Sequence, residues 1–489
     1  MEIVIAKNYT ELSQKAAMIF LNTLALNESS VFGLATGSTP LGMYEELAKN
    51  TKEYSYNWSK VKTFNLDEYL SLDKNHSQSY RYAMQKNFFN HVNIKAKNIH
   101  VPEGRSNDTE AFCKKYEQMV VRSDIDIQLL GLGVNGHIAF NEPGSKADSK
   151  TRVIRLSRST INANSRFFKN ISEVPTSAIT MGIGTILKAK RIILLASGKK
   201  KARAVRDMIE GRVSPKCPAS LLREHKNVTV IVDEEAASLL REKYPVKKDG
   251  WCSLRILNER VVPRNVRILV ISPHHDDSGV SAGATIRSLS KHNTVQTLVM
   301  TAGYHSEIAN ATNKQKIKIR NGEALKESKI LGSKLILSQF KFYDHDKKFW
   351  RGDLRKFHEI FRKVRPDIIL LPHQYDEHPS HRLSTELALD YIKEKKVSGI
   401  ELWYYEGLWS QHILNKIDIV FGFGVELLQI KNRALKAHRS QTKRLPISEA
   451  STALSRFRAK TLPEQRMVRF GGNPPVISDF AEVYHMEQV

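Results

Sequence analysis

The chain has 489 residues, more than one hydrophobic core normally serves, so two or three domains are expected. Its 76 Lys and Arg against 51 Asp and Glu give a formal charge of +25, but the basic residues are spread out and form no nucleic-acid-binding motif. The three cysteines form no C-x-x-C pair, and no apolar run approaches the roughly 20 residues of a membrane span. We therefore expect a protein of a reducing cytoplasm, without stable membrane insertion and without a nucleic-acid partner.

The first half of the chain alternates short apolar strands with helical patterns, beginning with a strand near Met1–Ala6. This alternation is typical of a doubly wound α/β domain built on a parallel sheet, and we place that domain at residues 1–240. The other strands predicted in it are Val31–Ala35, Val61–Phe64, Ile125–Leu130, Arg191–Ala196 and Val228–Val232.

The pattern is interrupted between the two halves of the chain. Arg241–Gly250 is rich in charge and contains Pro and Gly, and no clear periodicity returns before Arg264, which predicts a linker at residues 241–264. A second doubly wound α/β domain is predicted at residues 265–489. Its predicted strands include Val266–Ile271, Val295–Met300 and Asp367–Leu371.

A glycine-rich turn follows the strand predicted at Ile125–Leu130 and reads Gly131-Leu-Gly-Val-Asn-Gly-His137-Ile-Ala-Phe-Asn-Glu142-Pro-Gly144. It places an imidazole, an amide and a carboxylate at the strand's C-terminal end, the edge where open α/β sheets bind ligands. The glycines also match the dinucleotide pattern G-x-G-x-x-G, but Thr151–Arg158 lacks the acidic residue expected about 20 residues later. We favour a proton-handling site; the alternative is a structural turn whose His and Glu are only hydrogen-bonded.

Two further segments suit an anion. Thr36-Gly-Ser-Thr-Pro40 follows a predicted strand, and its Pro suits the first turn of a helix, so backbone amides and hydroxyls would face a phosphate. Ser197–Lys201 also opens a predicted helix and adds lysine charge. Either segment could instead be a solvated loop. Between them, Asp67 and Glu68 end a strand as adjacent carboxylates, which could supply a general base or only surface charge.

In order and spacing, these segments resemble the glucosamine-6-phosphate deaminase family: ATGSTP, FNLDEY, GHIAFNEPG, Asn164-Ser-Arg166-Phe-Phe168 and Gly198-Lys-Lys-Lys201. The resemblance implies a sugar-phosphate-isomerase-like fold and no cofactor for this domain. It implies that Asp67 carries a proton between C2 and C1 of the opened sugar, while His137, assisted by Glu142 and Asn135, opens the pyranose ring. The implied ligands of the 6-phosphate are Arg166 and Lys201, with Thr36, Gly37, Ser38 and Thr39 as further donors.

The residue Asn135 departs from family members that carry Asp at this position. An amide cannot act as a base, so the role of Asn135 would be limited to hydrogen bonding. Other members carry Asn here, and the expected deaminase activity therefore stands.

The second half repeats the pattern of polar residues at strand ends. Ser272-Pro-His274-His275-Asp276-Asp277 follows one predicted strand, and Pro372–His381, with His378 and His381, follows another. His274, Asp277 and His381 would form the two-imidazole, one-carboxylate set of a catalytic zinc site, which leaves a position for water and Asp276 as a base. The alternative is surface histidines beside acids, because one sequence cannot show that the two segments meet.

The second half resembles the PIG-L/LmbE family of zinc-dependent N-acetylglucosamine deacetylases, whose hallmark is A/P-H-P-D-D followed by H-P-x-H. The resemblance runs from Val266 to the C-terminus, with support from Arg320-Asn-Gly-Glu323 and Lys436–Gln441. It implies an LmbE-like fold in which Zn²⁺ activates water, Asp276 takes its proton, and His378 stabilises the oxyanion or protonates the leaving amine. In two departures, His275 replaces Pro and could compete as a ligand, and Ser278 replaces the common third acid.

Together the halves predict a bifunctional enzyme acting on small amino-sugar phosphates, because deacetylation of N-acetylglucosamine 6-phosphate yields the substrate of the deaminase. Two alternatives stay open at this stage. The deacetylase could act on an unrelated glycoconjugate, with the positive charge serving an anionic surface, or the first site could be a sugar-phosphate sensor without turnover. Whether the chain forms a homo-oligomer is also open.

Overall fold

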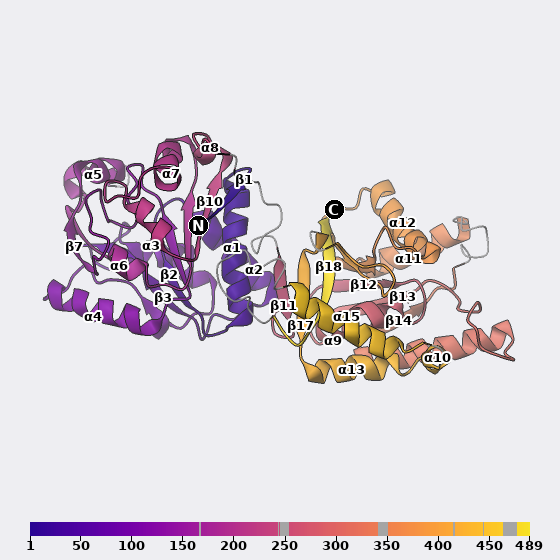
Figure 1. Cartoon of the computed structure of the whole chain (residues 1–489). Helices are drawn as coiled ribbons and strands as arrows, with labels where there is room; N and C mark the ends of the chain where they lie inside the picture. Colours follow the sequence, from indigo (N-terminus) through magenta and orange to yellow (C-terminus); the bar gives the residue numbers. More distant parts are fainter. Residues whose placement is uncertain are drawn as a thin grey trace. The chain divides into compact units, whose positions relative to one another are not determined.

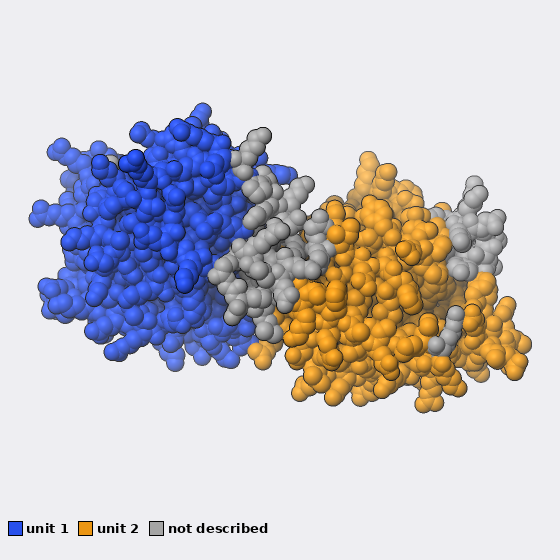
Figure 2. All heavy atoms as spheres, in the orientation of Figure 1, with its two compact units in different colours: residues 1–52, 56–253, 468–473 blue, residues 53–55, 254–467, 474–489 orange. Residues whose placement is uncertain are grey.

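The computed structural model describes residues 1–165, 168–242, 244, 254–340, 351–413, 416–443, 445–462 and 477–489. The chain divides into two compact units, with the main boundary between Ser253 and Leu254, and Figure 2 colours them separately. Each unit is built on its own largely parallel sheet with helices around it, which confirms the predicted α/β class (Figure 1). No helix in the described part of the chain is long and apolar enough to cross a bilayer.

The first unit contains a seven-stranded sheet in which every neighbouring pair of strands is parallel. The same unit also contains a small three-stranded antiparallel sheet, which was not predicted from the sequence. The large sheet has the order β1 (Glu2–Ala6), β10 (Val228–Asp233), β9 (Ile192–Ala196), β6 (Ile127–Gly131), β2 (Val31–Leu34), β3 (Lys62–Asn65) and β5 (Ile99–His100). The small sheet is β4 (Asp67–Tyr69), β8 (Ser177–Thr180) and β7 (Arg152–Arg155). The helices are α1 (Tyr9–Leu26), α2 (Leu41–Tyr54), α3 (Tyr80–Asn87), α4 (Thr109–Ser123), α5 (Arg158–Asn164), α6 (Ile183–Ile186), α7 (Ala202–Ile209) and α8 (Glu234–Ala237).

The second unit contains an eight-stranded sheet that is parallel except at β18, which runs antiparallel to both of its neighbours. Its order is β11 (Arg255–Asn258), β17 (Ile419–Phe423), β18 (Phe480–Gln488), β16 (Glu401–Tyr405), β15 (Ile368–Pro372), β12 (Arg267–Ser272), β13 (Thr294–Val299) and β14 (Lys334–Leu337). The helices are α9 (Asp277–Leu289), α10 (Asn313–Leu331), α11 (Arg351–Val364), α12 (Pro379–Glu394), α13 (Val425–Leu435), α14 (Arg439–Thr442) and α15 (Ile447–Leu462).

The second sheet has helices on both faces. Alternate side chains of β12, such as Leu269 and Ile271, pack into an apolar core with Phe357 of α11 and Leu387 of α12. Helices α9, α13 and α15 cover the opposite face (Figure 1). This three-layer arrangement buries both faces of the central strands, which explains why those strands are continuous apolar runs without polar alternation.

The strands predicted from the sequence are all present, with ends that differ by one or two residues. β11 lies within the segment predicted as linker and pairs with β17, so the second sheet begins before Val266. The strand β11 has four residues, which are too few for a clear alternation of apolar and polar side chains. Residues 245–253 of that segment, including Cys252, lie outside the described residues. The domain limits at 240 and 265 themselves stay a prediction.

Candidate active sites

Four neighbouring strands of the first sheet, β9, β6, β2 and β3, run parallel, and their carboxyl ends therefore lie at one edge. The segments that follow them carry Lys201, His137, Thr36 and Asp67 in that order. Residues separated by more than a hundred positions in the sequence are thus collected at one sheet edge, the place where α/β folds bind ligands.

The glycine-rich turn after β6 is shaped around the imidazole of His137. A Cβ atom at Gly133 would lie 2.4 Å from His137 Nε2, so only glycine leaves room for the ring. Gly136 has φ +83°, a conformation that side-chain-bearing residues rarely adopt. The next regular element is the strand β7 and not a helix, so the turn lacks the strand–turn–helix context of a dinucleotide site.

The carboxylate of Glu142 is held at both oxygens. Oε2 accepts a hydrogen bond from Asn135 Nδ2 at 2.7 Å and lies 3.5 Å from His137 Nδ1. Oε1 accepts hydrogen bonds from the hydroxyls of Ser157, at 3.1 Å, and Thr160. Burial alone would raise the pKa of Glu142, but the interactions with His137, Thr160 and Asn135 outweigh it and lower that pKa to about 2. Asn135 thus acts as a hydrogen-bond donor, in agreement with the limit set by its amide group.

The two adjacent carboxylates on β4 have different environments. Glu68 accepts backbone hydrogen bonds at 2.9 Å from Tyr69, Tyr80 and Arg81, so it caps the start of helix α3. Asp67 is buried, and no hydrogen bond between its carboxylate and another described residue is found. Burial, together with the charge of Glu68, raises the pKa of Asp67 well above its usual range. Of the pair, Asp67 is therefore the carboxylate available for proton transfer.

The two predicted anion-binding segments lie at the same sheet edge. Thr36–Thr39 separate β2 from α2, and the first turn of α2 begins with the hydrogen bond from Tyr44 N to Pro40 O. The Nζ of Lys201 donates to Leu132 O at 2.6 Å, which brings it to the turn that carries His137. Arg166, the other predicted phosphate ligand, lies outside the described residues.

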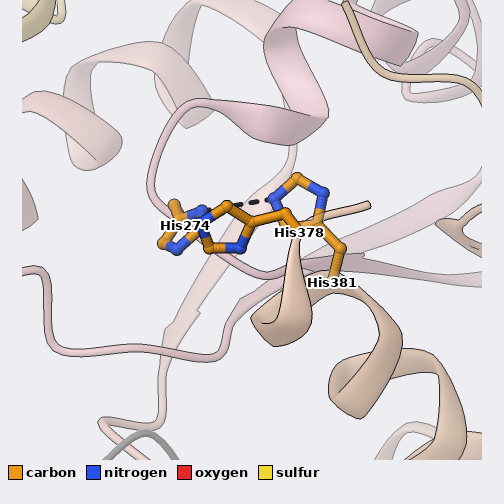
Figure 3. A group of neighbouring side chains, drawn as sticks. All are labelled: His274, His378 and His381. Atoms are coloured by element: carbon orange, nitrogen blue, oxygen red, sulfur yellow. Dashed lines mark hydrogen bonds between the residues drawn. The ribbon is translucent and has the colours of Figure 1, made fainter. Parts of the chain in front are cut away.

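In the second unit, the pairing of β12 with β15 brings the two histidine segments together. His274 Nδ1 lies 3.0 Å from Asp277 Oδ2, and His381 Nε2 lies 3.2 Å from the same oxygen. The two imidazole nitrogens are 3.3 Å apart, although the residues are separated by 107 positions in the sequence. Figure 3 shows these two histidines together with His378. The three predicted ligand atoms therefore form a compact triangle.

The triangle has the size of a zinc ligand set. Bonds of about 2.0–2.2 Å place tetrahedral ligand atoms about 3.3 Å apart, close to the three separations observed. Asp376 Oδ2 lies 3.1 Å from His381 Nδ1, so Nε2 is the nitrogen of His381 that remains for a metal. A carboxylate beside the second ring nitrogen is common at zinc-bound histidines. The nitrogens of His274, His378 and His381 also lie within 4.8 Å of one another, so His378 offers a second candidate ligand set.

The other polar residues of this site have distinct partners. Asp276 Oδ1 accepts a hydrogen bond from Arg320 Nη2 at 2.7 Å. Burial would raise the pKa of Asp276, but the charges of Arg320, His438 and His274 together outweigh it and lower that pKa. His275 is buried and pairs through Nε2 with Asn321 Oδ1 at 3.0 Å, so it does not compete for the metal position. Burial and the neighbouring histidines lower the pKa of His378 to about 4.

A cavity of about 330 Å³ opens onto this site, with Asp276 and the three histidines in its wall. The same cavity has an apolar wall that includes Phe340, Leu408 and Trp409. A polar end beside an apolar wall is typical of sites that orient a small ligand by a few polar groups.

Sequence reasoning missed several residues that hold these sites. Ser157 and Thr160 follow β7 and had no recognised motif, although a Ser directly before a helix is a common N-cap. Asp376 stands two residues before His378 in a segment noted for its His and carboxylate side chains, but it was given no role of its own. Arg320 was noted as part of a family motif, but its ion pair with Asp276 depends on the packing of α10 beside α9.

Comparisons with known proteins identify relatives of the first half of the chain. Residues 7–231 match the family described as glucosamine-6-phosphate isomerases/6-phosphogluconolactonases. A glucosamine-6-phosphate deaminase of Thermoanaerobacter sp. (strain X514) is 51% identical over 244 residues, which cover 96% of that protein and 50% of this chain. The chain belongs to the glucosamine-6-phosphate deaminase family. A solved monomeric glucosamine-6-phosphate deaminase is 47% identical and covers 49% of this chain and 100% of its own, with a TM-score of 0.48.

The second half of the chain, which the deaminase relatives do not cover, matches a different family. Residues 269–392 match the family described as GlcNAc-PI de-N-acetylase, PIG-L. An N,N'-diacetylchitobiose deacetylase from Pyrococcus horikoshii is 23% identical and covers 45% of this chain and 83% of its own, with a TM-score of 0.37. The family match at residues 269–392 indicates that a PIG-L deacetylase-like domain follows the deaminase domain.

The contact between Gly133 and His137 predicts the effect of a single added methyl group. Gly133→Ala would displace the imidazole, and a displacement of about 1 Å can lower a rate about 100-fold, so we expect a loss of this order in deaminase kcat. Gly131→Ala is the matched control, because its Cβ would meet no atom within 4 Å. Equal kinetics of the two variants, measured as ammonia release from glucosamine 6-phosphate, would show that the close approach is irrelevant.

The hydrogen bond from Asn135 to Glu142 predicts the result of restoring an acid. Asn135→Asp would place two carboxylates at the 2.7 Å separation now held by the amide, and they could not both ionise freely. We expect the pH profile of deaminase kcat/KM to gain an ionisation above the usual Asp pKa of about 3.9. A profile that superimposes on that of the unsubstituted protein would contradict this electrostatic account of Asn135.

Proposed function

We propose that the chain is a bifunctional amino-sugar enzyme. The first unit converts glucosamine 6-phosphate to fructose 6-phosphate and ammonia, and the second removes the N-acetyl group of an N-acetylglucosamine derivative with the help of a bound metal. The observation that carries the second half of this proposal is the triangle of His274, Asp277 and His381 beside the half-buried carboxylate of Asp276.

In the first unit, His137 opens the pyranose ring. Ring opening moves a proton from the anomeric hydroxyl to the ring oxygen, a task suited to an imidazole beside a fixed carboxylate. Glu142 lies 3.5 Å from His137 Nδ1 and supplies that negative charge. The role is a proposal supported by this geometry and by the family to which the chain belongs.

Asp67 then acts on the opened sugar. A carboxylate placed over two adjacent carbons can take a proton from C2 and return it to C1, and the resulting C2 imine loses ammonia to water. The 6-phosphate is held at the same sheet edge by Thr36, Gly37, Ser38, Thr39 and Lys201, with Arg166 as the further ligand expected from the sequence. These groups complete the reaction without a cofactor.

The role of Asp67 predicts both a loss and a pH dependence. Asp67→Asn should lower deaminase kcat by about 100-fold or more, because it removes the general base. Since the folded pKa of Asp67 is raised, its basic form is lost as pH falls through that raised value, and the acid limb of kcat should lie above the usual Asp range.

Glu68→Gln is the control for this experiment. It leaves Asp67 in place but weakens the hydrogen bonds at the start of α3, so it should lower stability by about 1–3 kcal/mol and preserve most of the deaminase activity. Loss of catalysis in Glu68→Gln with retention in Asp67→Asn would reverse the assignment of the two carboxylates.

In the second unit, we propose His274, Asp277 and His381 as the metal ligands. Zinc held there would lower the pKa of a bound water and polarise the acetyl carbonyl. Asp276, fixed by Arg320, is placed to accept a proton from the attacking water. His378 lies beside the ligands, its Nδ1 2.7 Å from Ser380 Oγ, and is assigned to stabilise the oxyanion or protonate the leaving amine.

The two candidate ligand sets differ in whether Asp277 or His378 completes the site. We expect Asp277→Ala to weaken zinc binding by at least about 100-fold, and His378→Ala to keep zinc affinity within about tenfold while losing deacetylase activity. Zinc affinity is measured by competition with a chromogenic chelator, and activity by acetate release. The opposite order of zinc affinities would assign His378 as the ligand in place of Asp277.

The acetylated substrate that best fits the fusion is N-acetylglucosamine 6-phosphate, since its deacetylation yields the substrate of the first site. Acetate release from this sugar by the zinc-loaded protein, abolished by a chelator, is the direct test. The free cysteines Cys113 and Cys217 fit the proposal that both reactions take place in a reducing cytoplasm.

A second candidate substrate, a glycoconjugate of N-acetylglucosamine, is favoured by one observation. Trp409 lines the cavity of the second unit yet is 72% exposed, and it stands beside the apolar wall formed by residues such as Leu408. A flat aromatic surface at the mouth suits a second ring or an apolar group attached to the sugar. Acetate released from such a conjugate and not from the 6-phosphate would establish this candidate instead.

A further inference from the structure

The two oxygens of Glu142 have separate sets of partners. Oε2 faces Asn135 and His137, the residues assigned to ring opening. Oε1 faces Ser157 and Thr160, which belong to the start of helix α5 and were not assigned any role from the sequence. A carboxylate with one oxygen anchored cannot rotate without breaking those bonds, so the anchor determines where the other oxygen points.

The start of α5 supplies this anchor with little freedom of its own. Ser157 is the N-cap residue, and its Oγ accepts a hydrogen bond from Thr160 N at 3.2 Å. Its hydroxyl can donate to Glu142 Oε1, at 3.1 Å, and Thr160 Oγ1 lies at 3.0 Å from the same hydroxyl. Thr160 is 6% exposed and donates its own hydroxyl to the same carboxylate oxygen. Both donors are thus fixed by the backbone of the helix.

We infer that Thr160 and Ser157 are positioning residues of the ring-opening step, which hold Glu142 by Oε1 so that Oε2 stays directed at His137. The inference rests on the proposed role of His137. A functional carboxylate keeps a productive geometry only when neighbouring hydrogen bonds lock its rotamer, because the terminal torsion of a glutamate is otherwise broad.

The same contacts also keep Glu142 ionised. Burial favours its protonated form, whereas the interactions with His137, Thr160 and Asn135 favour the carboxylate. Among the described residues, the groups that contact the Glu142 carboxylate are His137 and Asn135 from the glycine-rich turn, Thr160 from α5 and Ser157 at its N-cap. Loss of the Thr160 hydroxyl should therefore raise the pKa of Glu142, and the charge beside His137 would be lost at higher pH than before.

The test uses the full chain with Thr160→Val, which removes the hydroxyl at nearly constant volume, and Thr160→Ser, which retains it. Thr185→Val is the matched control, since Thr185 is a buried threonine of the same unit whose hydroxyl binds Glu117 at 2.7 Å. We expect Thr160→Val to lower deaminase kcat about tenfold with KM nearly unchanged, the equivalent of about 1.4 kcal/mol. The acid limb, which Asp67 sets, should stay in place, and Thr160→Ser should recover the rate.

Values of kcat and KM for Thr160→Val that match those of Thr185→Val would overturn the inference. If Thr160→Val does not fold, Ser157→Ala is measured instead, with the same direction of change expected. A separate variant tests the proposed ring opening by His137, on which the inference rests. Full deaminase activity of His137→Gln would contradict that role, whatever the outcome at Thr160.

Discussion

Parallel pairing of neighbouring strands is the constraint on which both sites depend. A parallel sheet sends the carboxyl ends of adjacent strands to one edge, and each unit uses that edge to join residues from distant parts of the sequence. The pairing of β12 with β15 brings His274 within 3.3 Å of His381, and the pairing of β6 with β9 brings Lys201 to the turn that carries His137. A shift in either pairing would separate the reacting groups while leaving every motif intact in the sequence.

The segments that carry chemistry could be predicted from the sequence, because glycine, histidine and acidic residues directly after apolar strands form a local pattern. The partners of those residues could not be predicted. Glu142 is anchored by Thr160 on a helix 18 positions later, and Asp276 by Arg320 on a helix 44 positions later. Such contacts depend on how helices pack on the sheet. The strand β18 was also not predicted. It lies in the sheet between β16 and β17, which both precede it in the chain, and such a position depends on tertiary pairing.

The two sites keep a carboxylate charged by different means. Neutral donors, an amide and two hydroxyls, surround Glu142, so its charge is available to the neighbouring imidazole. Asp276 is instead paired with a guanidinium, which is itself shared with Glu323. The shared guanidinium holds Asp276 in a fixed position, and this residue is the one proposed as the base of the second site. Both arrangements suit proton-transfer chemistry, and the proposal that the two sites act in sequence rests on the fusion of the two domains in one chain.

The most direct test of consecutive use is ammonia release by the zinc-loaded protein from N-acetylglucosamine 6-phosphate alone, with glucosamine 6-phosphate as the parallel substrate. Only deacetylation followed by deamination can release ammonia from the acetylated sugar. The account predicts ammonia from both substrates, and loss of ammonia from the acetylated sugar alone when Asp276 is replaced by Asn. Ammonia from glucosamine 6-phosphate only would contradict the proposal that the two sites act in sequence on this sugar.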